Sequence, residues 1–128
     1  MEFSQPKGIY QQIADQIRDR ILEGEWQSGE RIPSIRELAV SVGVNPNTVT
    51  KTYQALVDRQ IIENQRGLGY FVAPDARERI LTELRAEFLE HELPRVFRTM
   101  RMLGMRVEDL AAPFAAHAGG QSAKGAHQ

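Results

Sequence analysis

The sequence predicts a mainly α-helical protein, with three helices and a small β-hairpin followed by a short all-helical appendage. Two amphipathic stretches separated by a single glycine follow the first helical pattern, and they predict two short helices joined by a tight turn. Two short apolar runs then flank a glycine-rich tip, which is typical of a β-hairpin. The first helix is the clearest, because isoleucine recurs at every fourth position, at Ile9, Ile13, Ile17 and Ile21.

The first helix is expected over residues 9–22, with Gly24 as its stop. Trp26 follows in a turn-rich connector. A large aromatic side chain at this place is expected to pack between helices, and a contact with a partner molecule is the alternative.

The next two helices carry clear capping signals. Ser34 is expected to cap the first of them, and Glu37 three residues later completes a capping box. Gly43 supplies a left-handed turn, and Asn45 then caps the second helix ahead of Pro46. This arrangement predicts a helix-turn-helix, whose second helix suits the major groove of DNA.

The hairpin is expected to lie beside that helix as a wing. Residues 61–63 and 70–72 form its strands, and glycines around Leu68 permit positive φ angles at its tip. Arg66 would then point toward the DNA backbone or minor groove. Residues 1–73 are therefore predicted to form a winged helix-turn-helix domain.

An apolar helical appendage is predicted for residues 74–118, and a flexible tail for residues 119–128. Pro94 interrupts the helical pattern, so a kink or a break is expected near residues 90–93. Two helices cannot enclose so much apolar surface, which is most simply buried against a second copy in a symmetric dimer. The residues expected at this interface are Leu81, Leu84, Phe88, Val96, Phe97, Met100, Leu103, Leu110 and Phe114.

Charge is distributed unevenly along a chain whose net charge is −1. Residues 31–72 carry a net charge of +2, whereas residues 9–30 carry −3, so the positive charge lies in the segment expected to touch DNA. The chain has no cysteine, no apolar run of about 20 residues and no pattern typical of a signal peptide. A cytoplasmic location is expected.

Neither an enzyme nor a metal site is expected. His91, His117 and His127 do not have the spacing of zinc ligands. Glu83, Glu87, Glu90 and Glu92 share the expected helix with Arg79, Arg85 and Arg95, and they are expected to form a solvated, ion-paired face. No nucleophile–base pair or phosphate-binding glycine loop is apparent, so no catalytic residue and no cofactor are predicted.

Three separated motifs, at residues 29–39, 44–49 and 67–72, together resemble the DNA-binding domain of GntR-type bacterial transcription regulators. The short appendage resembles that of the YtrA-type subfamily. The resemblance implies a homodimeric repressor that binds a palindromic operator, often of a transporter operon. The operator sequence, the regulated genes and any small-molecule effector stay open, as does activation in place of repression.

The resemblance also implies the DNA-contacting residues. Several family members carry arginines where this chain has Pro46 and Thr50, so an adenine contact by Asn47 or a thymine-methyl contact by Thr48 is the more natural expectation. Lys51 is expected to meet phosphate, because its ammonium is a point charge. The full set is Arg36, Asn45, Asn47, Thr48, Thr50, Lys51, Arg66 and Gly67.

Two other functions are compatible with the pattern. A winged helix can serve protein interaction without specific DNA binding, with the long helix as a docking rod. The chain could also be a metabolite-sensing module, although its small appendage makes an enclosed pocket of about 300 Å³ hard to build.

Overall fold

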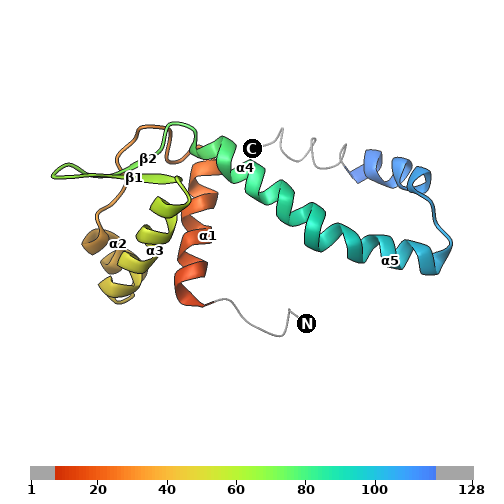
Figure 1. Ribbon diagram of the computed structural model, residues 1–128, viewed down its shortest axis with the longest axis horizontal. Coiled ribbons are helices and arrows are strands. Elements are labelled where there is room, and N and C mark those ends of the chain that lie inside the picture. Colours follow the sequence, from red (N-terminus) through yellow and green to blue (C-terminus); the bar gives the residue numbers. More distant parts are fainter. Residues whose placement is uncertain (1–7, 118–128) are drawn as a thin grey trace. The chain divides into compact units, whose positions relative to one another are not determined.

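The computed structural model, which describes residues 8–117, has the predicted helical architecture with a small β-hairpin (Figure 1). The predicted tail and His127 lie outside the described residues. No helix in the described part of the chain has the length and apolar character needed to cross a lipid bilayer. The elements are α1 (Ile9–Leu22), α2 (Ile35–Val42), α3 (Pro46–Asp58), β1 (Ile62–Gln65), β2 (Gly69–Val72), α4 (Ala76–Glu87), a π-helical turn (Phe88–Glu92), α5 (Leu93–Leu103) and a 3₁₀ turn (Val107–Leu110) continued by a helix over residues 111–117.

The core of the N-terminal part lies where α3 packs against α1, α2 and β1. The isoleucine stripe of α1 faces this core, since Ile13, Ile17 and Ile21 are buried while the helix's polar residues face out. Trp26 is also buried and lies under the guanidinium of Arg20, whose Cζ is 5.0 Å from the ring centroid. The predicted packing role of Trp26 is confirmed.

The predicted caps of α2 and α3 are present. The Ser34 hydroxyl accepts the Glu37 N–H at 3.0 Å, and the Glu37 carboxylate accepts the Ser34 N–H at 2.9 Å. Gly43 ends α2 with φ 73°, in the left-handed region. The Asn45 side chain then accepts the N–H of Asn47 at 2.7 Å. These local bonds fix the angle at which α3 leaves α2.

Tyr53 connects three segments of the core. Its side chain, 1% exposed, projects inward from α3, and its hydroxyl donates to the Pro33 carbonyl at 2.7 Å. Its ring meets that of Tyr70 on β2 edge to face, with centroids 4.8 Å apart. Burial raises the pKa of Tyr53 far above that of a free phenol. One side chain therefore holds together α3, the loop before α2 and the hairpin.

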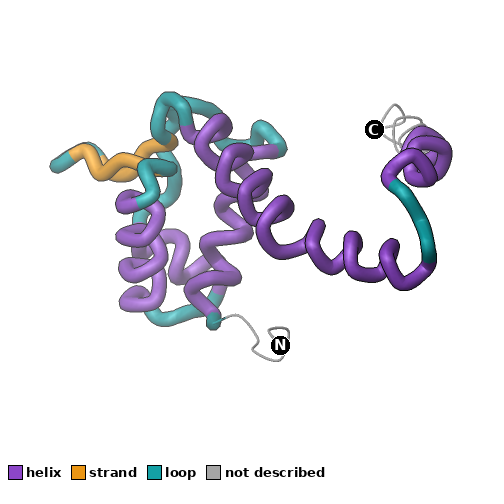
Figure 2. Tube along the Cα trace, turned by 45° about the vertical axis from the view of Figure 1, so that its right-hand side comes forward, coloured by secondary structure: helices purple, strands orange, loops and turns teal. Residues whose placement is uncertain are grey.

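The hairpin pairs β1 and β2 antiparallel, with Ile62 opposite Val72 and Gln65 opposite Gly69 (Figure 2). The tip turns at Gly67, whose φ is 78°. The other edge of β2 is also paired, because residues 30–32 run along it. The Val72 N–H donates to the Glu30 carbonyl and the Ile32 N–H to the Tyr70 carbonyl, each at 2.9 Å. The base of the wing is thus fixed on both sides.

The division between the two parts of the chain differs from the one expected after residue 73. The structure separates into two compact units between Leu84 and Arg85. The reason is that Ala76 and Ile80 on α4 are completely buried in the core of the first unit, and Leu84 packs partly against it. The first two turns of α4 therefore belong to the winged helix.

The second unit has almost no core of its own. Among residues 85–117 only Met100 is buried. The expected irregularity near Pro94 takes the form of the π-helical turn, in which the Leu93 N–H donates to the Phe88 carbonyl five residues back. The helix continues through this turn without a break and ends at Gly104, which has φ 68°.

Replacing Tyr53 by phenylalanine should lower the free energy of unfolding by about 1 kcal/mol, because the partly buried Pro33 carbonyl loses its hydrogen bond. Urea denaturation would measure this change. Tyr70→Phe is the matched control, since no hydrogen bond of its hydroxyl is present among the described residues. Equal losses in the two variants would contradict the role given to the Tyr53 hydroxyl.

The capping box should make stability depend on pH. Hydrogen bonds from Ser34 lower the pKa of Glu37 below its ordinary value of 4.5. The charged carboxylate therefore stabilises the fold above pH 4.5, and this contribution is lost as pH falls through the lowered pKa. Glu37→Gln should be less stable than the wild type at neutral pH, and the difference should shrink under acid. Urea denaturation at several pH values tests this, and a difference that does not change with pH would contradict it.

Candidate nucleic-acid interface

The side of α3 that faces away from the core carries the residues expected to read DNA. Val49, Tyr53 and Leu56 are buried beneath it. The helix geometry consequently turns the remaining positions outward. The predicted residues on this side are Asn45, Asn47, Thr50 and Lys51, which are exposed, and Thr48, which is half-buried.

Some of these polar side chains already make a hydrogen bond within α3 or at its start, and others do not. The Asn45 side-chain oxygen serves as the helix cap. The Thr50 hydroxyl donates to the Pro46 carbonyl at 3.1 Å, which is a bond within the helix. The Asn47 side chain makes no hydrogen bond to any described residue. A free, exposed amide offers a donor and an acceptor together, which is what adenine recognition requires.

Lys51 is positioned by an aromatic ring on another helix. Its ammonium nitrogen lies 4.6 Å from the ring centroid of Tyr10 on α1. A cation over an exposed aromatic face gains about 0.5–1 kcal/mol. This contact holds the charge at the junction of α1 and α3, and sequence spacing alone gave no sign of it.

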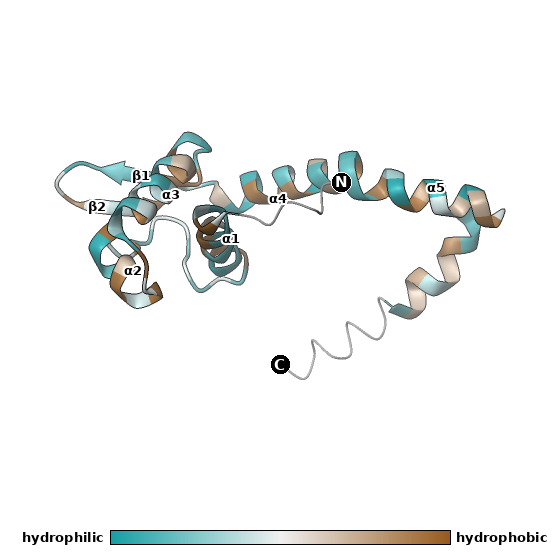
Figure 3. Ribbon diagram, turned by 90° about the horizontal axis from the view of Figure 1, so that it is seen from below, coloured by the Kyte–Doolittle hydropathy of each residue, from teal (hydrophilic) through white to brown (hydrophobic). Residues whose placement is uncertain are grey.

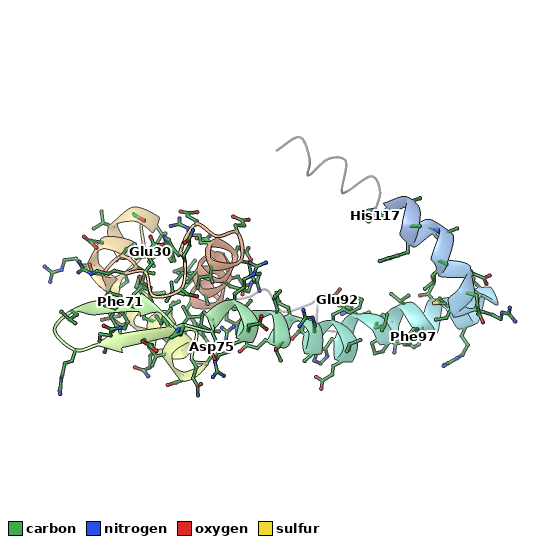
Figure 4. All side chains as sticks on the ribbon, turned by 90° about the horizontal axis from the view of Figure 1, so that it is seen from above. Glu30, Phe71, Asp75, Glu92, Phe97 and His117 are labelled. Carbon is green, nitrogen blue, oxygen red and sulfur yellow. The ribbon has the colours of Figure 1, made fainter. Side chains whose placement is uncertain are left out.

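The other predicted cations stand on separate elements of the first unit. Arg36 is exposed on α2, and Arg66 is exposed at the wing turn next to Gly67. The positive φ of Gly67 confirms the conformational requirement expected at the tip. Figure 4 shows the wing, with Phe71 labelled on its return strand.

Ion pairing divides the cations of residues 8–84 into two groups. Arg18, Arg20, Arg59 and Arg79 each lie within ion-pair distance of a carboxylate, and Arg59 and Glu83 are the closest pair at 2.6 Å. Arg77 donates instead to the Leu22 carbonyl. A cation without an acidic partner is available to bind phosphate, whereas a nearby carboxylate largely neutralises a paired cation. Besides Arg77, the cations without an acidic partner in this range are Arg31, Arg36, Lys51 and Arg66.

Arg31 was not among the predicted site residues. In the sequence it lies inside the motif of residues 29–39 and contributes to the positive net charge of residues 31–72. The structure pairs it with Phe71 across β2, next to the wing. A pairing of one residue with one other leaves no periodic pattern in the sequence. The basic side chain was therefore the feature that could have pointed to a role in DNA binding.

Among residues 8–117, which the structure describes, no group of three or more histidine, aspartate and glutamate side chains lies close enough together to hold a metal ion. His91 is exposed, and its Nε2 lies 3.7 Å from Oε1 of Glu90.

Comparison with known proteins agrees with this geometry. The family of bacterial regulatory proteins called gntR matches residues 9–72. The uncharacterised HTH-type regulator YhcF of Bacillus subtilis is 38% identical over 85% of this chain and 88% of its own length. The transcriptional repressor YtrA of the same organism is 34% identical over 80% of this chain and 78% of its own length.

A solved structure has the same architecture over most of its length. The crystal structure of a transcriptional regulator of the GntR family from Bacteroides thetaiotaomicron is 38% identical, with a TM-score of 0.78, and the match covers 89% of this chain and 99% of that one. Three helices, a hairpin wing and C-terminal helices therefore recur in a protein of similar length. The chain belongs to the gntR family of bacterial regulatory proteins and is a DNA-binding transcriptional regulator.

Proposed function

We propose that this regulator is a homodimeric repressor that binds a palindromic operator with α3 and the wing of each copy. The observation that carries the proposal is the set of unpaired cations on α2, α3 and the wing. Two copies related by a two-fold axis would read two half-sites of the same sequence, so the operator is expected to be palindromic. The similarity to the repressor YtrA supports repression, and the resemblance to YtrA-type regulators makes a transporter operon an expected target. The protein would act in the cytoplasm.

Each predicted residue has a physical role in this proposal. Arg36, Lys51 and Arg66 contact phosphate and set the register of the protein on the duplex. Asn47 reads adenine through its free amide, and the methyl group of Thr48 meets thymine. Asn45 and Thr50 support the start of α3 and approach the backbone, and Gly67 lets the wing tip come close to the minor groove.

The second unit is proposed to hold the two copies together. Large apolar side chains without partners in their own unit favour burial against another protein surface. Leu103 and Phe114 are 66% and 73% exposed, and Phe88, Val96 and Phe97 are exposed as well. Leu81, Leu84 and Leu110 are half-buried and Met100 is buried, so they contribute less new burial than the exposed residues.

The π-helical turn brings apolar residues of the second unit onto one face. In a regular α-helix, at about 100° per residue, Val96 and Phe97 would lie about 80° and 180° around the axis from Phe88. A π turn holds one extra residue, so these angles become about 20° and 80°. The extra residue therefore rotates Phe97 from the helix face opposite Phe88 to within about 80° of it. Apolar and polar residues alternate along this helix in Figure 3.

Charge along the same helix favours an antiparallel second copy. Residues 85–92 carry a net charge of −2, whereas α5 carries +3 from Arg95, Arg98 and Arg101. An antiparallel arrangement places the acidic stretch of one copy beside the basic stretch of the other. A parallel arrangement would oppose like charges, which is unfavourable. Figure 4 labels Glu92, the last residue of the acidic stretch, and Phe97 further along the helix in the basic stretch.

Removing the predicted phosphate contacts should abolish specific DNA binding. Fluorescence anisotropy on duplex from the protein's own promoter, across a salt series, should show affinity that falls with salt in the wild type. Affinity should collapse in the combined variant Arg36→Ala/Lys51→Ala/Arg66→Ala, because three cations that neutralise phosphates are lost. The salt slope should also become shallower by about 0.9 for each phosphate contact that is removed.

Arg18→Ala is the matched control, since Arg18 is already paired with Asp15 and Asp19. It should bind like the wild type. Wild-type binding no tighter than to random DNA, and unaffected by the triple variant, would overturn the repressor proposal and favour a protein-interaction module.

Inserting one alanine after His91 should separate the two copies. The insertion rotates the helix that follows it by about 100°, and so moves Phe97 to the face opposite Phe88. Deleting His91 is the matched control, because it removes the extra residue of the π turn and leaves Phe97 at about 80° from Phe88 in a regular helix. Sedimentation equilibrium should show a dimer for the wild type and for the deletion, and a monomer for the insertion. Circular dichroism should show a similar helix content in all three. An insertion variant that dimerises as tightly as the wild type would contradict this interface.

A further inference from the structure

Arg31 lies in the short segment that pairs with the outer edge of β2, the return strand of the wing. It pairs with Phe71, and the flanking hydrogen bonds between Glu30 and Val72 and between Ile32 and Tyr70 fix both neighbours of Arg31. The residue is exposed although its backbone is fixed. An exposed side chain on a fixed backbone loses less conformational entropy when it binds a partner.

The guanidinium of Arg31 lies against Gly69 at the start of β2. A Cβ atom on Gly69 would sit 2.9 Å from Nε of Arg31 and 3.5 Å from its second terminal nitrogen. Gly69 also has φ 119°, which side-chain-bearing residues rarely adopt. Glycine at this position therefore gives the arginine room to lie along the wing, in addition to permitting the turn.

No acidic side chain neutralises Arg31. It has no ion pair among the described residues, unlike the four paired arginines of the same unit. The nearby carboxylate of Glu37 accepts the Ser34 N–H, and Arg31 acts on the pKa of Glu37 only through a minor long-range attraction. The wing unit therefore presents two unpaired arginines from separate segments, Arg66 at the turn and Arg31 beside the first residue of the return strand.

We propose that Arg31 is a further DNA-binding residue that contacts a backbone phosphate, and that Gly69 is the residue that leaves room for it. The inference rests on the proposed DNA-binding function. A guanidinium can make two parallel hydrogen bonds to one phosphate, whereas an ammonium acts as a point charge. The contact positions the wing on the duplex and carries no base preference.

The test compares Arg31→Ala and Arg31→Lys with the wild type, by fluorescence anisotropy on the promoter duplex and on a random duplex across a salt series. Arg31→Ala should weaken binding to both duplexes by the same factor and lower the salt slope by about 0.9, the value for one phosphate. Arg31→Lys should keep most of the slope, and the control Arg18→Ala should change neither quantity.

Gly69→Ala tests the space argument, and it should weaken binding to both duplexes in the wild-type background. The backbone strain at φ 119° acts in both backgrounds. The same change should therefore have a smaller effect on binding in the Arg31→Ala background, and the difference between the two effects measures the part that acts through Arg31. Equal effects in the two backgrounds would contradict the role given to Gly69. Thermal unfolding identifies variants that fail to fold, and Arg31→Ala, which removes no internal contact of the core, keeps the inference testable.

An unchanged salt slope in Arg31→Ala would overturn the inference while leaving the proposed function standing. A loss confined to the promoter duplex would overturn it too, because it would indicate a base contact. Wild-type protein that binds neither duplex in a salt-dependent way would overturn the proposed function together with this inference.

Discussion

The DNA-facing surface depends on how firmly α3 is held by its buried face. Val49, Tyr53 and Leu56 are at most 1% exposed, so the rotation of the helix about its axis is determined by packing. The bond from Tyr53 to Pro33 then joins that buried face to the loop ahead of α2. A helix fixed from below can present short polar side chains such as those of Asn47 and Thr48 at a constant angle. Short side chains need that precision, because they cannot reach around a misplaced backbone.

Much of the winged helix could be predicted from the sequence, because its signals are local. The capping box at Ser34, the left-handed Gly43 and the Asn45 cap each depend on residues within a few positions, and all three are present in the structure. The isoleucine periodicity of α1 is equally local. The family resemblance added the expectation of a DNA-facing set, and the structure shows which of those side chains are exposed and unpaired.

The features that sequence reasoning missed depend on distant contacts. Ala76 and Ile80 have the same helical spacing whether they face the winged-helix core or a second copy, so the pattern could not decide where the first unit ends. The π turn is composed of ordinary helix-forming residues, and Pro94 signalled an irregularity without indicating its kind. The contact of Lys51 with Tyr10 and the pairing of Arg31 with Phe71 each join segments about 40 residues apart, which periodicity does not detect.

Trp26 is the only tryptophan of the chain, and it is buried in the first unit beneath Arg20. Its intrinsic fluorescence is therefore a built-in reporter of that unit. The emission should shift to longer wavelength when the winged helix unfolds and water reaches the indole. If the second unit holds two copies together as proposed, the same emission should not respond when they separate through residues 85–117. Optical unfolding and hydrodynamic measurements on the unlabelled protein will consequently follow two different events.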